Sequence, residues 1–454
     1  MFFNELESFS DNTALIAGQS KMTYGELNRA CAMVRQQLPE KPGVGLLYCR
    51  NDMASVIAYL ACLQAKQVVL LLDADVSDSI SHQIFACYQP DFVVKDGQAQ
   101  IVAGGKQAPD KNVTLLLSTS GSTGSPKQVA LSAKNIHSNA SAIADYLNIS
   151  AQDVAITTLP MFYSYGLSVI NSHLASGAAI VLSNETFMSR EFWQALDAHK
   201  VTNIAGVPHS YQMLQKLGFL RKSFPHLRYM TQAGGKLDRA TVVAFAEYAQ
   251  NQNLSFFIMY GQTEATARIA YLHPDKVLRK PEAIGQAIPR GNLRLCQPGS
   301  ELEISQANQI GELIYKGENV MLGYVSNRTE LAEIAPLREL RTGDLAYFDE
   351  EGDFFISGRL KRFVKITGKR TNLDDVERLL EARGICAKVT GNDQRLDILC
   401  SGVLPEKLNI EVGQQLGLHA SFIGCHENID IPITDNGKTD YIAIAKSLGY
   451  EDNC

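Results

Sequence analysis

The stretch Ser118-Thr-Ser-Gly-Ser-Thr-Gly-Ser-Pro-Lys127 contains residue types that can bind an anion. Its glycines let the backbone approach a ligand closely, its backbone N–H groups and hydroxyls can donate hydrogen bonds, and Lys127 adds a positive charge. Small polar runs are also typical of linkers. The Walker A spacing is absent, because Lys127 follows Gly124 only after Ser125 and Pro126. From these residues alone, a phosphate-binding loop and an ordered structural loop both stay open.

A second polar group follows the apolar run Phe256–Met259, which predicts a buried strand. Tyr260, Thr263 and Glu264 would then lie at the carboxyl end of that strand, where open α/β sheets bind ligands. An aromatic ring, a hydroxyl and a carboxylate can there contact a base, a phosphate and Mg²⁺. Taken without its neighbours, however, Glu264 is better explained as a solvated loop charge.

Alternating β-type and helical patterns predict the elements that position these residues. The alternation runs from Val44 to about Ser120 and returns after Ile149, which indicates parallel sheets covered by helices. The strands predicted in the second region are Val154–Leu159, Ala179–Leu182, Asn203–Val207, Tyr229–Thr231 and Phe256–Met259. After Leu293, shorter alternating runs and a turn at Glu350-Glu-Gly-Asp353 predict antiparallel structure. A small α+β unit is expected after Arg359, with a helix over Val376–Arg383 closed by Gly384.

The composition favours a partner of low molecular mass. The formal charge of −6 and the pI near 5.9 argue against a nucleic-acid-binding surface. No apolar run approaches the ~20 residues of a transmembrane segment, and the first residues lack the basic region of a secretory signal. The nine cysteines contain no Cys-x-x-Cys pair, so we expect reduced thiols in a cytoplasmic protein and no metal site at Cys425-His426.

The opening stretch and several further blocks together resemble the adenylate-forming superfamily of acyl- and aryl-CoA synthetases, peptide-synthetase adenylation domains and beetle luciferases. The further blocks are Tyr260-Gly-Gln-Thr-Glu264, Gly311-Glu-Leu-Ile-Tyr-Lys-Gly317 with Leu322-Gly-Tyr324, Arg341-Thr-Gly-Asp-Leu345, Gly358-Arg-Leu-Lys361 and Asp435-Asn-Gly-Lys438. The resemblance extends from Thr23-Tyr-Gly-Glu-Leu27 to the end of the chain. It implies an α/β fold in which a large AMP-binding domain (1–359) of mostly parallel sheets with a small antiparallel part precedes a mobile α+β domain (360–454).

The resemblance also implies a role for each matched residue. The expected contacts to the phosphates of ATP come from Ser118, Thr119, Ser120, Gly121, Ser122, Thr123, Gly124 and Lys127. Tyr260, Gly261 and Gly235 would contact the nucleotide, Asp344 and Arg359 its ribose, Thr263 the α-phosphate, and Glu264 the Mg²⁺ ion. Lys438 would hold the substrate carboxylate near the α-phosphate, and Lys361 would be the hinge.

The block Leu159-Pro-Met-Phe-Tyr-Ser-Tyr-Gly-Leu167 indicates the substrate class. Adenylation domains for α-amino acids place Asp directly after the Phe, whereas this chain has Tyr163 there. Because an uncharged position cannot offset the burial of an ammonium, we expect a carboxylic acid without an α-amino group. The pocket candidates are Tyr163, Tyr165, Val207, Pro208, Gly234 and Gly235, although both tyrosines are explained equally well as packing residues.

The resemblance leaves the acceptor thiol open. We expect an ATP-dependent acid–CoA ligase that forms an acyl-adenylate and then a thioester. A ligase that loads the phosphopantetheine of an acyl-carrier protein is the first alternative, and a nucleotide-binding protein without catalysis is another. A luciferase-type oxygenase shares the motifs.

Six basic residues between Arg359 and Arg370 could contact CoA or an acidic carrier, or form a solvated face. Asp375-Val-Glu377 and Thr371 depart from the family pattern and weaken expectations for how the C-terminal domain packs.

Overall fold

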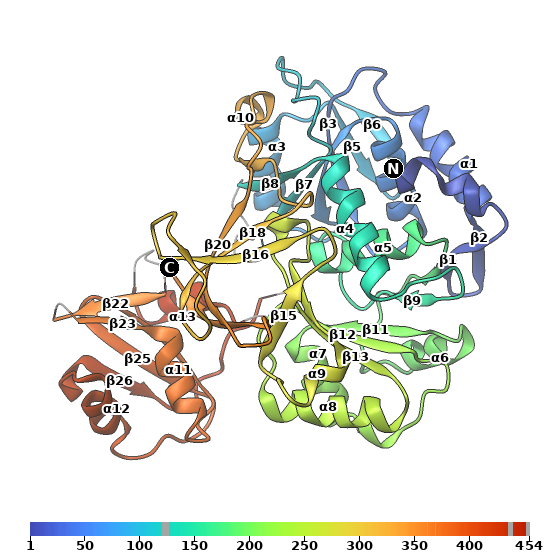
Figure 1. Cartoon of the computed structure of the whole chain (residues 1–454). Helices are drawn as coiled ribbons and strands as arrows, with labels where there is room; N and C mark the ends of the chain where they lie inside the picture. Colours follow the sequence, from blue (N-terminus) through green and yellow to red (C-terminus); the bar gives the residue numbers. More distant parts are fainter. Residues whose placement is uncertain (120–126, 361, 368, 435–438, 451–454) are drawn as a thin grey trace. The chain divides into compact units, whose positions relative to one another are not determined.

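A computed structural model describes residues 1–119, 127–360, 362–367, 369–434 and 439–450, with only the backbone at 370. The chain forms two compact units (Figure 1). Unit 1 comprises residues 1–292 and 315–340, and unit 2 comprises residues 293–314 and the chain from 341 onward. The domain boundary between residues 359 and 360 stays a prediction.

The first sheet of unit 1 has parallel strands at its centre, as the alternating pattern predicts. Its strands in spatial order are β15 (Ala283–Ala287), β14 (Ala270–Leu272), β13 (Ser255–Tyr260), β12 (Tyr229–Gln232), β11 (Asn203–Gly206), β9 (Val154–Ile156), β10 (Ala179–Val181), β1 (Thr13–Ala17) and β2 (Ser20–Thr23). From β13 to β1 neighbouring strands run parallel, whereas β14, β15 and β2 are antiparallel to their neighbours. Strand β9 ends at Ile156, before the predicted Leu159, and beyond its end the Thr158 hydroxyl donates to the Ala205 carbonyl at 2.5 Å.

The second sheet of unit 1 carries the opening stretch of the sequence. Its strands in spatial order are β19 (Gly323–Val325), β8 (Gln128–Leu131), β7 (Leu115–Ser118), β4 (Val68–Asp73), β3 (Val44–Cys49), β5 (Phe92–Lys95) and β6 (Gln98–Ile101). Every residue of β3 is buried, which explains its continuous apolar run. Strands β7 and β8 are antiparallel, with Ser118 opposite Gln128. The stretch between them therefore joins two paired strands and is not a linker between domains.

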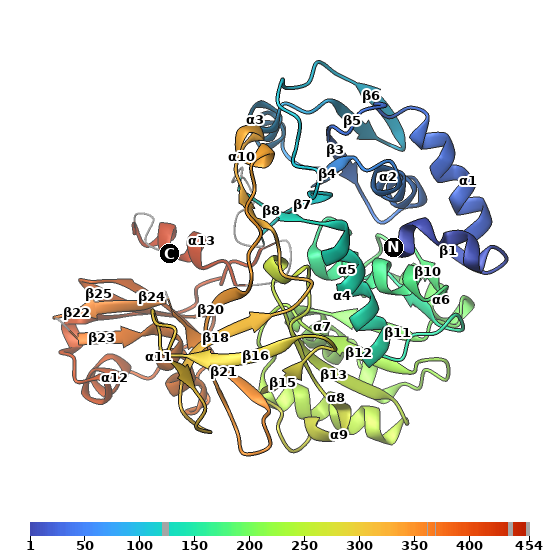
Figure 2. The ribbon, with the colours of Figure 1, turned by 45° about the horizontal axis from the view of Figure 1, so that its top comes forward.

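Helices surround the two sheets of unit 1 (Figure 2). They are α1 (Tyr24–Arg35), α2 (Met53–Gln64), α3 (Asp78–Tyr88), α4 (Ala133–Tyr146), α5 (Ser164–Ala175), α6 (Arg190–Ala198), α7 (Pro208–Lys216), α8 (Arg239–Asn251), α9 (Pro274–Val277) and α10 (Arg328–Ala332). Helix α4 begins after Ser132, whose hydroxyl accepts from the Asn135 N–H at 3.1 Å as an N-cap. In the described part of the chain, no helix has the length and apolar character needed to cross a membrane.

Unit 2 contains the expected antiparallel structure. One group of strands has the order β17 (Glu303–Ile304), β16 (Asn292–Cys296), β18 (Gly311–Lys316), β20 (Leu340–Phe348) and β21 (Phe354–Arg359). Strands β20 and β21 pair antiparallel around the predicted turn. Strand β18 and the first residue of β20 cross the boundary between the units.

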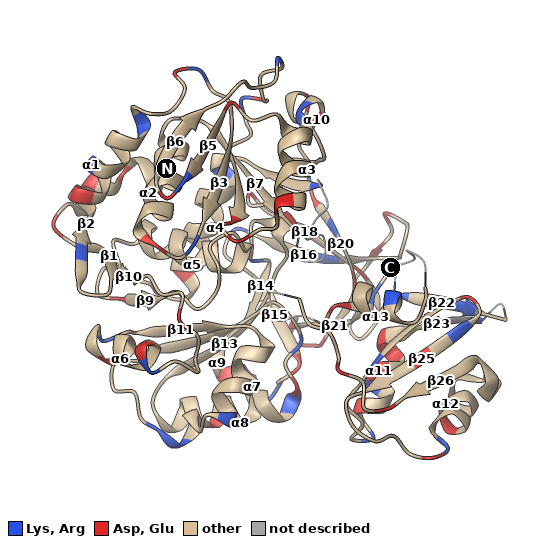
Figure 3. Cartoon of the chain, turned by 180° about the vertical axis from the view of Figure 1, so that it is seen from behind, with Lys and Arg blue, Asp and Glu red and all other residues tan. Residues whose placement is uncertain are grey.

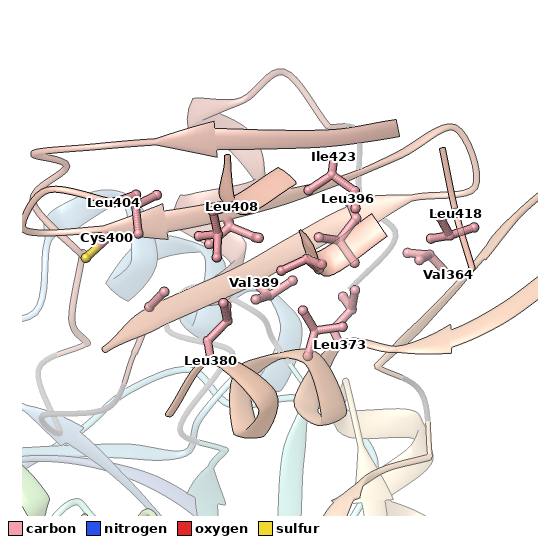
Figure 4. Close-up of a cluster of buried hydrophobic side chains, with 14 of the residues drawn as sticks. Val364, Leu373, Leu380, Val389, Leu396, Cys400, Leu404, Leu408, Leu418 and Ile423 are labelled. Carbon is pink, nitrogen blue, oxygen red and sulfur yellow. The ribbon is translucent and has the colours of Figure 1, made fainter. Parts of the chain in front are cut away.

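The C-terminal part of unit 2 has its own core (Figure 4). Its elements are β22 (Phe363–Ile366), β23 (Lys369–Asn372), α11 (Leu373–Glu381), β24 (Ala387–Asn392), β25 (Arg395–Cys400), α12 (Leu408–Leu416), β26 (Ile423–His426) and α13 (Tyr441–Ser447). Leu380 of α11 packs with Val389 and Leu396 of the sheet. Helix α11 begins three residues before the predicted Val376, because the Asn372 side chain caps it. The basic residues Lys365 and Lys369 lie exposed on β22 and β23 (Figure 3).

A buried histidine connects three elements of unit 1. His173 of α5 donates from Nδ1 to the Val169 carbonyl at 2.8 Å. Its Nε2 accepts from the Asn203 amide at 3.0 Å and from the Tyr229 hydroxyl at 3.2 Å. Burial lowers the pKa of His173 to about 4.

We predict that His173 makes unit 1 less stable in acid. An unfolded histidine binds a proton below about pH 6.5, whereas the native ring binds one only near pH 4, so the free energy of unfolding falls as the pH drops through this interval. The expected loss is about 3 kcal/mol. Denaturation followed by the fluorescence of Trp193, the single tryptophan, should show this loss in the wild type and not in His173→Gln. His82→Gln, at an exposed position, is the control; an identical pH dependence in all three proteins contradicts the assignment.

Candidate active site

Strand β13 delivers the predicted polar group to its carboxyl end. Tyr260 is the last residue of the strand, and Thr263 and Glu264 lie in the short 3-10 helix Thr263–Ala265 that follows. Gly261 allows this turn, because a Cβ there would lie 1.7 Å from the Ala267 carbonyl oxygen. Thr263 is buried, and its hydroxyl lies 3.1 Å from that of Ser164. The turn therefore presents Glu264 while Thr263 faces the start of α5.

Tyr324 joins two predicted functional residues of unit 1. Its hydroxyl donates to Glu264 Oε1 at 2.6 Å, and Lys127 Nζ lies 3.8 Å from the centre of its ring. Burial raises the pKa of the Tyr324 phenol, and the neighbouring Glu264 charge raises it further, so the hydroxyl remains a donor at neutral pH. Because Tyr324 is opposite Val129 on the paired strands β19 and β8, it lies beside the end of the Ser118–Lys127 stretch. The structure thus brings Lys127 and Glu264 to the same tyrosine.

Asn319 holds the turn that carries Glu264. Its buried amide donates to the carbonyl oxygens of Ala265 and Arg268, both at 2.8 Å. The Asn319 carbonyl accepts from the Thr266 hydroxyl at 2.7 Å, and the Glu264 carbonyl accepts from the Met321 N–H at 2.8 Å. The segment around Asn319 lies within the block that starts at Gly311, but the sequence alone did not single out this residue. Asn319 follows Lys316-Gly317-Glu318, so the local sequence reads as a polar turn and carries no signal of its burial.

The pocket candidates lie together around Gly234. A Cβ at Gly234 would lie 2.9 Å from the Tyr163 hydroxyl and 3.0 Å from Val207 Cγ1, and one at Gly235 would lie 3.2 Å from Pro208 Cγ. Gly234 also has a φ of +87°, which favours glycine. Side chains from two segments therefore meet the glycine pair of a third at a position where only glycine leaves space. This arrangement joins Tyr163, Val207, Pro208, Gly234 and Gly235.

Tyr165 lies behind Tyr163. The two rings are 6.3 Å apart at 67°, and the Tyr165 hydroxyl makes 2.9 Å contacts with the Thr231 carbonyl and hydroxyl. Tyr165 has 2% of its surface exposed and packs against Tyr163. The guanidinium carbon of the buried Arg268, which the sequence reasoning missed, lies 4.0 Å from the centre of the Tyr165 ring.

In unit 2, the pairing of β20 with β21 brings together the two predicted ribose contacts. Asp344 is opposite Arg359, and Asp344 Oδ1 lies 3.5 Å from Arg359 Nε. Asp344 is buried, whereas 65% of the Arg359 side chain is exposed. The ends of the hairpin are held by the Leu360 N–H, which donates to the Gly343 carbonyl at 2.7 Å, and by the Arg359 N–H, which donates to Asp374 at 2.7 Å.

Two further interactions in unit 2 connect blocks that the sequence singled out. Arg341 donates to the buried carboxylate of Glu312 at 2.6 Å, which ties β20 to β18. Arg362 Nη2 donates to Glu377 at 3.0 Å and its guanidinium lies 3.8 Å from the centre of the Tyr441 ring. Since Tyr441 also donates to Glu377 at 3.0 Å, α13 is anchored to α11.

Some predicted residues lie outside the described part of the chain. These are Ser120, Gly121, Ser122, Thr123, Gly124, Lys361 and Lys438. Of the two described residues that begin the stretch, Ser118 donates its hydroxyl to Gln128 Oε1 at 2.9 Å, and Thr119 follows directly after β7. Among the described residues, no three His, Cys, Asp or Glu side chains form a metal cluster.

Comparisons with known proteins agree with this geometry. A family model described as "AMP-binding enzyme" matches residues 97–325. The indoleacetate–CoA ligase of Aromatoleum aromaticum is 26% identical over 76% of this chain and 65% of its own length. Luciferin 4-monooxygenase of Photuris pensylvanica is 29% identical over 60% of this chain and 50% of its own length. The chain thus spans about half to just under two thirds of the length of these relatives.

A solved structure confirms the predicted fold class. O-succinylbenzoate coenzyme A synthetase (MenE) from Bacillus subtilis, in complex with AMP, has a TM-score of 0.78 at 21% identity over 97% of this chain and 96% of that chain. The complex of MenE with ATP and magnesium ion has a TM-score of 0.76 at 20% identity over 97% and 98%.

We predict that Asn319→Asp destabilises unit 1 by about 2–4 kcal/mol, because a carboxylate would face two carbonyl oxygens that now accept hydrogen bonds. Denaturant unfolding followed by Trp193 fluorescence measures the change. Asn251→Asp, at the exposed end of α8, makes the same chemical change without buried partners and should stay near the wild-type value. Equal stability of both variants would show that the Asn319 amide does not hold the turn.

Proposed function

We propose a function from the premise that this chain belongs to the AMP-binding enzyme family. The proposed activity is the ATP-dependent ligation of a carboxylic acid to the thiol of CoA. First, a carboxylate oxygen attacks the α-phosphorus of ATP, and pyrophosphate leaves with the electrons of the broken P–O bond. The thiol sulfur then attacks the acyl carbonyl and loses its proton, and AMP leaves. The protein's part is to position the reactants and balance their charge.

The observation that carries the proposal is the contact of Lys127 and Glu264 through Tyr324. It places a cation from the end of the phosphate stretch beside a carboxylate at the carboxyl end of β13. Lys127 would bind the pyrophosphate and stabilise the charge that develops as it leaves. Thr119 and the residues that follow it would donate to the same phosphates.

A single carboxylate such as Glu264 fits Mg²⁺, which in nucleotide sites takes most of its ligands from phosphates and water. When bound, the ion neutralises phosphate charge. Tyr324 keeps a hydrogen bond on Glu264 Oε1 and so restricts the orientation of that carboxylate.

The acid would bind beside Thr263. The Thr263–Ser164 contact joins the nucleotide turn to α5, which starts directly after the pocket residue Tyr163. Burial raises the pKa of Tyr163 to about 12, so the phenol is neutral at physiological pH. A neutral phenol cannot pair with an ammonium, which supports an acid without an α-amino group.

The remaining roles are proposals that follow from the family. Asp344 would accept hydrogen bonds from the ribose hydroxyls, and Arg359 beside it would add a second contact. Tyr260, Gly261 and Gly235 would contact the nucleotide, Lys438 the reacting carboxylate, and Lys361 would act as the hinge between domains 1–359 and 360–454.

CoA is the preferred acceptor because a relative of this chain is a CoA ligase. An acyl-carrier protein is the alternative. A nucleotide-binding protein without catalysis is disfavoured, because Lys127, Glu264, Asp344 and Lys438 are all retained.

The proposal is tested by ATP–pyrophosphate exchange with aliphatic, aromatic and hydroxy acids. Exchange with at least one acid, followed by AMP release when CoA is added, is the expected result. AMP release with a phosphopantetheinylated carrier and not with CoA would favour the alternative acceptor. If no acid supports exchange, the ligase function is wrong.

We predict that Tyr324→Phe lowers kcat/KM for ATP about 10- to 100-fold in the exchange reaction, because the variant loses a hydrogen bond to a charged group. Tyr324→Leu should lose more, since it also removes the ring beside Lys127. Tyr248→Phe is the matched control, because it removes a phenol that donates at 3.0 Å to the Lys222 carbonyl. If Tyr324→Phe resembles Tyr248→Phe in its kinetics, Tyr324 does not position the site.

A further inference from the structure

Arg268 is a buried cation without a carboxylate partner among the described residues. Its exposed fraction is 3%, and it follows the turn held by Asn319. Its Nε donates to Met259 Sδ at 3.4 Å, and its guanidinium lies over the Tyr165 ring. The other buried arginine of unit 1, Arg328, is paired with Asp91 and with two backbone carbonyls. The two residues therefore differ in how their charge is balanced.

The surroundings of Arg268 are apolar and aromatic. Met259, Tyr163 and Tyr165 belong to one buried cluster, with Tyr146 packed against it. Burial raises the pKa of the phenols of Tyr146, Tyr163 and Tyr165, and the positive charge of Arg268 opposes that rise at all three. The positive charge of Arg268 therefore acts on the phenol of Tyr163, the pocket residue that lies against Gly234.

Burial of a guanidinium is costly unless a counter-charge or strong hydrogen bonds accompany it. A hydrogen bond with the neutral Tyr146 phenol, stacking on an aromatic ring and a contact with a thioether recover only part of that cost. A buried guanidinium whose charge is balanced only in part can bind an anionic group of a ligand. Its planar shape matches a carboxylate through two parallel hydrogen bonds.

We infer that Arg268 binds a second carboxylate of the substrate, so that the acid is a dicarboxylic acid. This inference rests on the proposed function. The reacting carboxylate would lie toward Thr263, and the distal carboxylate would reach past Tyr163 to the guanidinium. The cation would also repel an ammonium group, in agreement with an acid that lacks an α-amino group. Arg268 is in this view a specificity-determining residue.

The test compares acids of equal length with one or two carboxylates. Succinate, glutarate, adipate and phthalate are paired with butyrate, pentanoate, hexanoate and benzoate in ATP–pyrophosphate exchange. The wild type should prefer at least one diacid over its partner by about 100-fold in kcat/KM. Arg268→Met, which keeps an unbranched side chain without the charge, should lose that preference, because its kcat/KM should fall far more for the diacid than for the monoacid. Arg268→Lys should recover part of it, because it restores the charge without the bidentate geometry.

A structural role would give a different result. If Arg268 only supports the fold, Arg268→Met lowers the thermal midpoint and reduces exchange with diacids and monoacids alike, and the inference is overturned. If it binds substrate, Arg268→Met is at least as stable as the wild type, since it removes an unpaired buried charge.

A binding measurement separates this inference from the proposed function. The thermal midpoint of the full chain, followed by Trp193 fluorescence, is measured with each diacid and each monoacid in the absence of ATP. A rise with a diacid that Arg268→Met abolishes supports the inference, even if exchange fails and the ligase function is wrong. Exchange by the wild type with monoacids and diacids at equal efficiency overturns the inference and leaves the ligase function standing. No rise with any diacid, together with no exchange, overturns both.

Discussion

The carboxamide of Asn319 donates to two backbone carbonyls in the turn after β13, and the arrangement of the candidate site depends on that pair of hydrogen bonds. The turn has no regular secondary structure beyond one 3-10 helix, and Thr266 and Ala267 both have positive φ. Such a segment needs partners for its backbone groups, because unpaired buried carbonyls are costly. By supplying them, Asn319 fixes the backbone from which Glu264 projects on one side and Arg268 on the other.

Two cations of unit 1, Lys127 and Arg268, lie against the faces of tyrosine rings. Tyr324 lies between Lys127 and Glu264, and Tyr165 lies under Arg268. A ring face balances the charge of a buried guanidinium less fully than a carboxylate would. We propose that Lys127 contacts phosphate and that Arg268 contacts the distal end of the acid.

Unit 2 organises its functional candidates differently, by direct ion pairs within a hairpin and a small core. Asp344 and Arg359 are opposite each other on β20 and β21, and Arg341 on the same strand is held by Glu312. Farther along the chain, Arg362, Glu377 and Tyr441 join the start of the C-terminal part to its last described helix. Arg362 directly follows Lys361, the residue that the family resemblance assigns to the hinge.

The sequence by itself determined the class of fold and singled out the residues that we propose to do chemistry. The run Val68–Leu72 had to be a strand covered on both faces, and the resemblance of the blocks to the family singled out Lys127, Glu264 and Asp344. It assigned no role to Tyr324, and it passed over Asn319 and Arg268, because a local pattern does not record which distant residues become neighbours. Only the tertiary structure decided that Tyr324 reaches Glu264 and that Arg268 is buried with no carboxylate partner in the part of the chain that the structure describes. The reason is that these contacts depend on strand order and register, which bring together segments that lie far apart along the chain.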